Sequence, residues 1–147
     1  QASIHHLQQA ARINPEDEGA KQKLVEVLIA AGRKRLANGQ TGEAGSDLAD
    51  AISLDPDNAD ATQLLGAVYL QDGRLDRAEE LFRRAIQLRP DFALAFHNLG
   101  VTLAQKREWP NARAQFEQAL IIRPDYVSAR RYLEQIDMID PKQLRNP

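Results

Sequence analysis

Apolar and small residues recur along this chain with a period of 34 residues. Pro56, Pro90 and Pro124 mark the period, and the segments 59–92 and 93–126 are identical at 11 of their 34 positions. Within each segment the apolar residues follow the i, i+3, i+4 spacing of two amphipathic helices. A repeat of this length is typical of stacked two-helix units that contact only their neighbours. We therefore expect an all-α fold, an α-solenoid of antiparallel helix pairs.

The boundaries of the helices are clearest in the unit 59–92. Its first helix is expected over 59–71, before Gly73, and its second helix is expected to begin near Asp76. Pro90 ends the second helix, because proline has no N–H to donate and clashes with the preceding turn. Small residues and one phenylalanine recur where the two helices of a unit are expected to cross closely: Gly66, Ala78, Phe82 and Ala85, then Gly100, Ala112, Phe116 and Ala119.

The unit before these, 16–58, departs from the pattern in two ways. Its first helix is expected to start near Glu16-Asp17-Glu18, about two turns early, with acidic residues well placed for the helix dipole. Its second helix contains Gly42 and Gly45, and an interior glycine costs roughly 1 kcal/mol relative to alanine. We expect this helix to be the least stable of the protein.

The two ends of the repeat differ from each other. Residues 1–15 resemble the second helix of a unit that lacks its first helix, so we expect a longer array to precede them. Residues 127–140 resemble a first helix, but Arg130 and Glu134 stand at the places of Phe96 and Gly100. Charges on that face are what a terminal cap requires, so we expect a capping helix followed by a tail at 141–147.

The recurring residues resemble those of the tetratricopeptide repeat family. Each unit has Leu-Gly around its eighth position, alanine at the twentieth, an aromatic residue at the twenty-fourth, and then alanine and proline. The resemblance covers residues 25 to 140 and the half-unit before them. It implies a right-handed superhelix whose first helices line a concave groove that holds a peptide or helix of a partner protein.

The resemblance places the second, fifth, sixth and ninth positions of each first helix on the groove. These positions are Glu26, Ile29, Ala30 and Arg33; Asp60, Gln63, Leu64 and Ala67; Leu94, His97, Asn98 and Val101; and, in the cap, Ser128, Arg131, Tyr132 and Gln135.

These groove residues differ from those of the family members that bind the C-terminal carboxylate of heat-shock chaperones. Those members carry lysine at the second position, where this chain has Glu26, Asp60 and Leu94. They carry asparagine or arginine at the sixth position, where only Asn98 matches. The groove is instead apolar with a polar rim, which favours an amphipathic helix or an extended apolar segment as the ligand.

The composition excludes several other classes of function. The net charge of −2 argues against nucleic-acid binding, and no apolar run approaches the ~18 residues of a membrane-spanning helix. The absence of cysteine excludes disulfides and thiol chemistry. The compartment stays open between cytoplasm and periplasm.

Candidate chemical sites are few. Adjacent histidines such as His5 and His6 point away from each other on a helix and lack a partner at i+4, so we expect no metal site there. His97 is expected on the groove, where it would form a hydrogen bond to a partner. The glycines at 39, 42 and 45 lack the Lys-Ser/Thr ending of a phosphate loop. Trp109 is expected to pack at a helix turn. No acid, base and nucleophile converge on one face, so we expect neither an enzyme nor a cofactor.

The leading hypothesis is therefore an interaction module that binds a segment of another protein. Leu64, Leu94, Asn98 and Arg131 are expected to contribute most to affinity, and Leu64→Glu is expected to abolish binding without loss of helicity. A second hypothesis is self-assembly, with another copy of the chain in the groove. A third is an array that regulates or targets a catalytic domain elsewhere in a larger protein.

Overall fold

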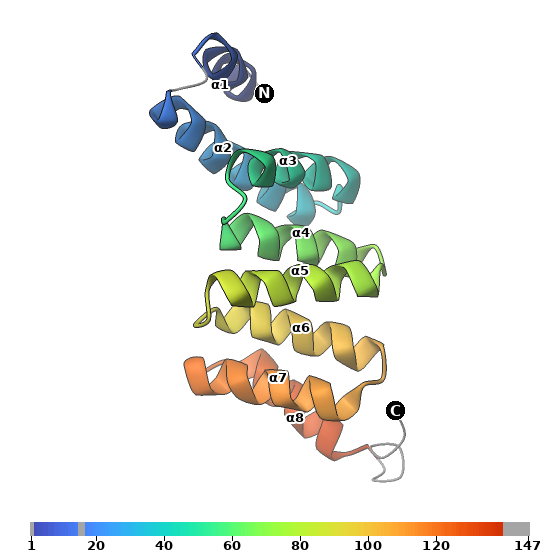
Figure 1. The fold of residues 1–147 in the computed structure, drawn as a ribbon. Coiled ribbons are helices and arrows are strands. Elements are labelled where there is room, and N and C mark those ends of the chain that lie inside the picture. Colours follow the sequence, from blue (N-terminus) through green and yellow to red (C-terminus); the bar gives the residue numbers. More distant parts are fainter. Residues whose placement is uncertain (1, 15–16, 140–147) are drawn as a thin grey trace.

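The computed structural model describes residues 2–14 and 17–139, which form eight α-helices stacked one after another (Figure 1). The helices are α1 (Ala2–Ile13), α2 (Glu18–Ala37), α3 (Thr41–Leu54), α4 (Ala59–Gln71), α5 (Leu75–Leu88), α6 (Ala93–Gln105), α7 (Trp109–Ile122) and α8 (Val127–Asp137). No strand occurs in the described ranges. The fold is thus an α-solenoid of helix pairs, which confirms the fold class expected from the repeat.

The helices pack in pairs, and the pairs stack in chain order. The helices α2 and α3, α4 and α5, and α6 and α7 form the pairs, while α1 packs against α2 and α8 packs against α7. The first helices of successive pairs also touch, α2 with α4 and α4 with α6, whereas the second helices have no comparable contact over the described residues. A stack curves toward its more closely spaced layer, so the first helices line the inner face of the solenoid.

Glycine lets the two helices of a pair cross closely. A Cβ atom on Gly66 of α4 would lie 2.8 Å from the ring of Phe82 on α5, and one on Gly100 of α6 would lie 2.8 Å from the ring of Phe116 on α7. Carbon atoms in ordinary contact stand about 3.5–4 Å apart, so no side chain fits at either glycine without displacing the ring. The crossing expected from the sequence is confirmed at both positions.

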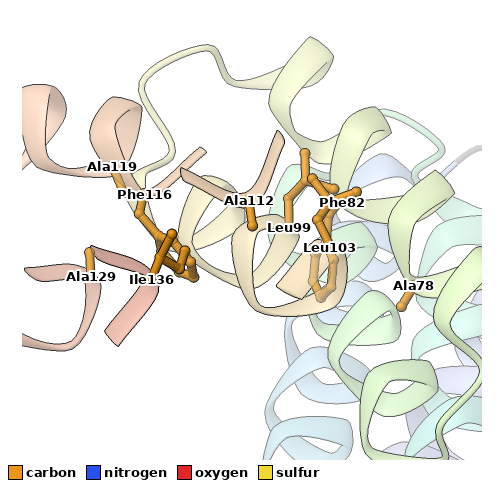
Figure 2. Packing of buried hydrophobic residues seen from close by; sticks show 9 residues of the cluster. All are labelled: Ala78, Phe82, Leu99, Leu103, Ala112, Phe116, Ala119, Ala129 and Ile136. Carbon is orange, nitrogen blue, oxygen red and sulfur yellow. The ribbon is translucent and has the colours of Figure 1, made fainter. Parts of the chain in front are cut away.

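Buried side chains form a strip along the solenoid rather than one central core. Figure 2 shows the cluster that joins the helices α5 to α8, which consists of Ala78, Phe82, Leu99, Leu103, Ala112, Phe116, Ala119, Ala129 and Ile136. Two smaller clusters lie toward the N-terminus, and their buried members are Leu24, Val25, Leu28, Ala51 and Ala61 in one, and Ala44, Leu48, Leu64 and Val68 in the other. Because each cluster spans only neighbouring helices, a change in one unit acts mainly on the adjacent ones.

The turn inside each pair uses the same backbone conformation in three units. Gly39, Gly73 and Arg107 stand 34 residues apart, and their φ angles are 75°, 71° and 63°. This left-handed conformation costs a residue with a side chain roughly 1–2 kcal/mol, and glycine avoids that cost. The third unit therefore forms its turn at a backbone cost that the first two avoid.

The pair α2–α3 is held partly by polar contacts. Gly32 allows the close approach, because a Cβ atom there would lie 2.7 Å from Leu48 on α3. Arg35 stands where Tyr69 stands in the next unit, and it forms ion pairs with Asp47 and, at 3.4 Å, with Glu43. Asp47 is buried. Between α2 and α3 the ion pairs of Arg35 thus stand where the next unit has the aromatic side chain of Tyr69. The repeat pattern alone does not predict these ion pairs.

We expect Gly45→Ala to raise the free energy of unfolding by about 1 kcal/mol, the difference in helix propensity between glycine and alanine. Gly45 lies inside α3, and a Cβ atom there would be 3.6 Å from Val68, an ordinary contact. Urea denaturation followed by circular dichroism measures the change. The matched control is Gly73→Ala, which has room for a methyl group but a φ of 71°, so it is expected to destabilise. A change of the same sign in the free energy of unfolding of both variants would contradict the explanation by helix propensity at Gly45 and by positive φ at Gly73.

Candidate partner-binding groove

The sixteen positions expected on the groove all lie on the first helices α2, α4, α6 and α8, but their exposure differs widely. Seven are exposed: Glu26, Ala30, Arg33, Leu94, Ser128, Arg131 and Gln135. Six are half-buried: Ile29, Asp60, Ala67, Asn98, Val101 and Tyr132. Three are buried: Gln63, Leu64 and His97. Their role in binding stays a prediction, and the buried three are not available as contacts on this surface.

Leu64 is a core residue rather than a groove residue. Its side chain is 8% exposed and packs in a cluster with Ala44, Leu48 and Val68, which joins α4 to α3. The expectation that Leu64 is open to a partner is therefore wrong. Glutamate at this position would bury a carboxylate, so Leu64→Glu would destabilise the fold and would not test binding.

His97 is enclosed by aromatic rings from α7, from α8 and from the residue that caps α8. Its ring centroid lies 5.5 Å from that of Phe116, 4.8 Å from that of Tyr126 and 5.6 Å from that of Tyr132. The side chain is 9% exposed, and its Nδ1 atom is buried without a hydrogen-bond partner in the described part of the chain. Nδ1 therefore cannot reach a partner in this conformation, and the expected hydrogen bond from His97 to a partner stays a prediction that only Nε2 can meet.

Burial and, to a smaller extent, the positive charge of Arg123 together lower the pKa of His97 to about 4. The imidazole is therefore neutral at physiological pH. A neutral ring fits the aromatic surroundings, since an imidazolium there would lose its hydration without a compensating carboxylate. His97 thus helps to attach α8 to α6 and α7.

Arginine side chains lie over aromatic rings at the junctions between units. The guanidinium of Arg89 is 4.3 Å from the ring centroid of Phe92, and that of Arg123 is 3.5 Å from the ring centroid of Tyr126. Arg89 also binds Asp60, with 2.7 Å between Nη2 and Oδ2. The residue equivalent to Asp60 in the next unit is Leu94, so this carboxylate partner is not repeated for Arg123.

The accessible inner face is apolar toward the C-terminal end. Leu94 on α6 is 38% exposed, and Asn98 and Val101 follow it along the same helix. Beyond them lies a hollow of about 370 Å³ between α6, the start of α7 and α8. We call it the Trp109 hollow, and its lining residues are Val101, Ala104, Gln105, Trp109, Tyr132, Gln135, Ile136 and Ile139.

Trp109 was expected only as a packing residue, and its position serves two purposes. It is half-buried against the cluster that joins α5 to α8, and it also forms part of the hollow wall. The apolar wall opposite comes from α8, where Ile136 stands at the place of Thr102 and Ile139 at the place of Gln105. These two isoleucines are the signal in the sequence that points to an apolar hollow here.

A second hollow of about 540 Å³ lies at the N-terminal end, where the early start of α2 faces the loop between α3 and α4. It combines apolar and acidic side chains, and its lining residues are Glu18, Lys21, Gln22, Val25, Glu26, Ile29, Leu54, Asp55, Pro56 and Asn58. Its cation, Lys21, is 3.5 Å from Glu18. We call it the acidic hollow.

The structure offers little support for other kinds of site. His5 and His6 are exposed with their ring centroids 6.3 Å apart, and no cluster of three metal-ligating side chains occurs in residues 2–14 and 17–139.

Lys106 links α5 to the turn after α6 through Asp76 at 2.9 Å and Glu79 at 2.8 Å, and these contacts raise its pKa. None of the helices in these ranges is both long and apolar enough to cross a membrane.

The charged residues Arg130 and Glu134, on which the expectation of a cap rests, lie on the surface of α8. Arg130 and Glu134 on α8 are both exposed, and Arg130 donates a hydrogen bond of 2.7 Å to the carbonyl oxygen of Pro124. These two side chains are therefore hydrated, and the role of α8 as a cap stays a prediction.

Solved structures share this architecture, although a search of curated protein sequences finds no match. The first TPR domain of Spaghetti (RPAP3), bound to the HSP90 peptide SRMEEVD, has a TM-score of 0.74 and 21% identity over 77% of this chain and 90% of its own. MamA has a TM-score of 0.77 and 23% identity over 97% of this chain and 78% of its own. A mutant O-GlcNAc transferase from Thermobaculum terrenum has a TM-score of 0.77 and 25% identity over 84% of this chain and 25% of its own.

The sequence profile of the tetratricopeptide repeat matches residues 35–99 and 69–134, well over half of the chain. The matched segments contain the Leu-Gly, alanine and phenylalanine positions at which the helices cross. On this match, and with the fold described above, the chain belongs to the tetratricopeptide repeat family.

Proposed function

We propose that this chain is a non-enzymatic protein–protein interaction module that holds an apolar or amphipathic segment of a partner along its inner face. The observation that carries the proposal is the exposed apolar side chain of Leu94 on α6, continuous with Val101 and the Trp109 hollow. Exposed apolar surface inside a groove with a polar rim is typical of a protein-binding site.

A relative supports the proposal at the level of the fold. The TPR domain of Spaghetti is bound to a peptide of HSP90, so this architecture accommodates a peptide. The present chain lacks the lysine expected at the second position for gripping a terminal carboxylate, and Leu94 stands there in the third unit. We therefore infer that its segment is held by apolar contacts.

We expect Leu94→Glu to weaken partner capture at least tenfold, because a carboxylate at the centre of an apolar contact must be desolvated on binding. The matched control is Ile121→Glu on α7, which places the same charge at an apolar side chain that is 70% exposed. Affinity capture with the three proteins, followed by quantitative mass spectrometry, measures the effect. Thermal melts should be the same for both variants.

The two variants also separate the competing functions. Equal capture by wild type and Leu94→Glu would contradict the groove as the binding surface. If another copy of the chain occupies the inner face, light scattering over a concentration series will show a growing mass that Leu94→Glu abolishes. The transferase from Thermobaculum terrenum, of which this chain matches 25%, is the reason to keep a regulatory array within a larger protein as a further candidate.

A further inference from the structure

The Trp109 hollow is at the small end of the range of ligand pockets, which is about 300–1,000 Å³. Its volume is about 370 Å³, and its lining is mainly apolar, with polar groups on Gln105, Gln135 and Tyr132. Eight residues line it, whereas each side of a stable interface between folded proteins comprises about 20–30 residues. Its dimensions therefore fit an anchoring side chain of a bound segment better than the surface of a second folded copy.

The amides beside the hollow give that segment polar partners. Gln105 on α6 and Gln135 on α8 are both exposed and both line the hollow. An amide side chain donates and accepts hydrogen bonds, so it can pair with the main chain of a ligand whose side chain is buried between them. The hollow is continuous with the proposed groove through Val101, Tyr132 and Gln135.

Charge is distributed unevenly along the solenoid. Residues 17–73 contain ten acidic and five basic side chains, whereas residues 74–139 contain nine acidic and eleven basic ones. The acidic hollow lies in the first of these regions and includes Glu18, Glu26 and Asp55, with Lys21 as its only lysine or arginine. Glu26 is exposed and has no ion pair among the described residues. A basic ligand segment complements this end of the molecule.

We propose that the inner face selects a segment of another protein that carries a large apolar side chain for the Trp109 hollow and lysine or arginine residues for the acidic hollow. This inference rests on the proposed function and adds the chemistry of the partner. The apolar anchor provides affinity at the C-terminal end, and the basic residues set how the segment lies along the groove.

The test is a selection of random twelve-residue peptides displayed on phage against the full chain. Enriched peptides are expected to share a large apolar residue and at least one lysine or arginine. Trp109 is the only tryptophan in the chain, so its fluorescence emission reports directly whether a synthetic copy of a selected peptide fills the hollow. Replacing the shared apolar residue of the peptide with alanine is expected to weaken binding at least tenfold and to remove the fluorescence change.

Variants of the protein test each half of the inference. Val101→Glu, in the hollow wall, is expected to weaken binding at least tenfold, and Glu26→Lys is expected to weaken it severalfold at low salt and less at high salt. The matched control is Gln118→Glu on α7, which adds a charge at an exposed position outside both hollows. If Val101→Glu fails to fold, the peptide with alanine in place of its apolar residue still tests whether that residue binds in the hollow.

The possible outcomes distinguish this inference from the proposed function. Selected peptides that are acidic, or that bind equally well to Val101→Glu, would overturn the inference, and the groove would stand if Leu94→Glu still abolished their binding. A selection that enriched no peptide would overturn both. Apolar and basic peptides that depend on Val101 and Glu26 would support both.

Discussion

Phe116→Ala is expected to lower the free energy of unfolding by about 4 kcal/mol, which lies within the range of about 3–5 kcal/mol for truncation of a buried phenylalanine. The ring of Phe116 is fully buried, stacks on that of Tyr132 with 4.9 Å between centroids, and fills the space left by Gly100. Neither the backbone at Gly100 nor the rigid helix crossing can close the resulting cavity. Urea denaturation followed by circular dichroism measures the loss.

The effect should be confined to one end of the solenoid. Because each unit is stabilised mainly by its neighbours, amide hydrogen exchange is expected to accelerate in α6, α7 and α8 and to change little in α2 and α3. Ile121→Ala on the same helix is the control, since that side chain is 70% exposed and its loss should cost less than about 0.5 kcal/mol. Uniform acceleration of exchange along the chain would show that the protein unfolds as a single unit instead.

The parts of the fold that depend on contacts within a unit could be predicted from the sequence. Gly66 and Gly100 were expected at close crossings because each recurs with a phenylalanine sixteen residues later, and both crossings are present. The helix α2 was expected to start about two turns early, and it begins at Glu18. Both features are local: the repeat shows the close crossing twice, and the start of α2 depends on residues of that helix alone.

The exposure of the inner face could not be predicted in the same way, because it depends on the neighbouring unit. Gln63 and His97 hold the fifth position of their helices and are buried, whereas Arg131 holds the same position on α8 and is exposed. The period shows that these three residues are equivalent. It does not show which side chains of the adjacent helix lie over them, so Leu64 and His97 were assigned to the groove although they belong to the core.

The aromatic cluster around His97 follows from the same dependence on neighbours. Tyr126 is the last residue of the third unit and Tyr132 lies on α8, and the ring centroids of both are within 6 Å of that of the imidazole. In the preceding unit the equivalents of these tyrosines are Phe92 and Asn98, and the buried residue is Gln63, a neutral amide. The chain therefore uses a neutral polar side chain at both buried positions, and only the histidine can acquire a charge.

His97 should consequently make the stability of the protein depend on pH. Its pKa is about 4 in the folded state because of burial, against about 6.5 for histidine in an unfolded chain. As the pH falls through 6.5, the unfolded state binds a proton that the folded state does not, so stability is full above this pH and is lost below it. At 1.36 kcal/mol per pKa unit, the total loss is about 3 kcal/mol once the pH reaches the folded-state pKa.

The variant His97→Gln isolates this contribution, because it introduces the residue that the preceding unit already buries at Gln63. The carboxylates of the chain titrate in both proteins and cancel in the comparison. Urea denaturation at intervals from pH 7.5 to pH 4 should show that the wild type loses about 3 kcal/mol more than His97→Gln over this range. Parallel curves for the two proteins would mean that the imidazolium finds a hydrated position, and that α8 leaves the aromatic cluster open to water.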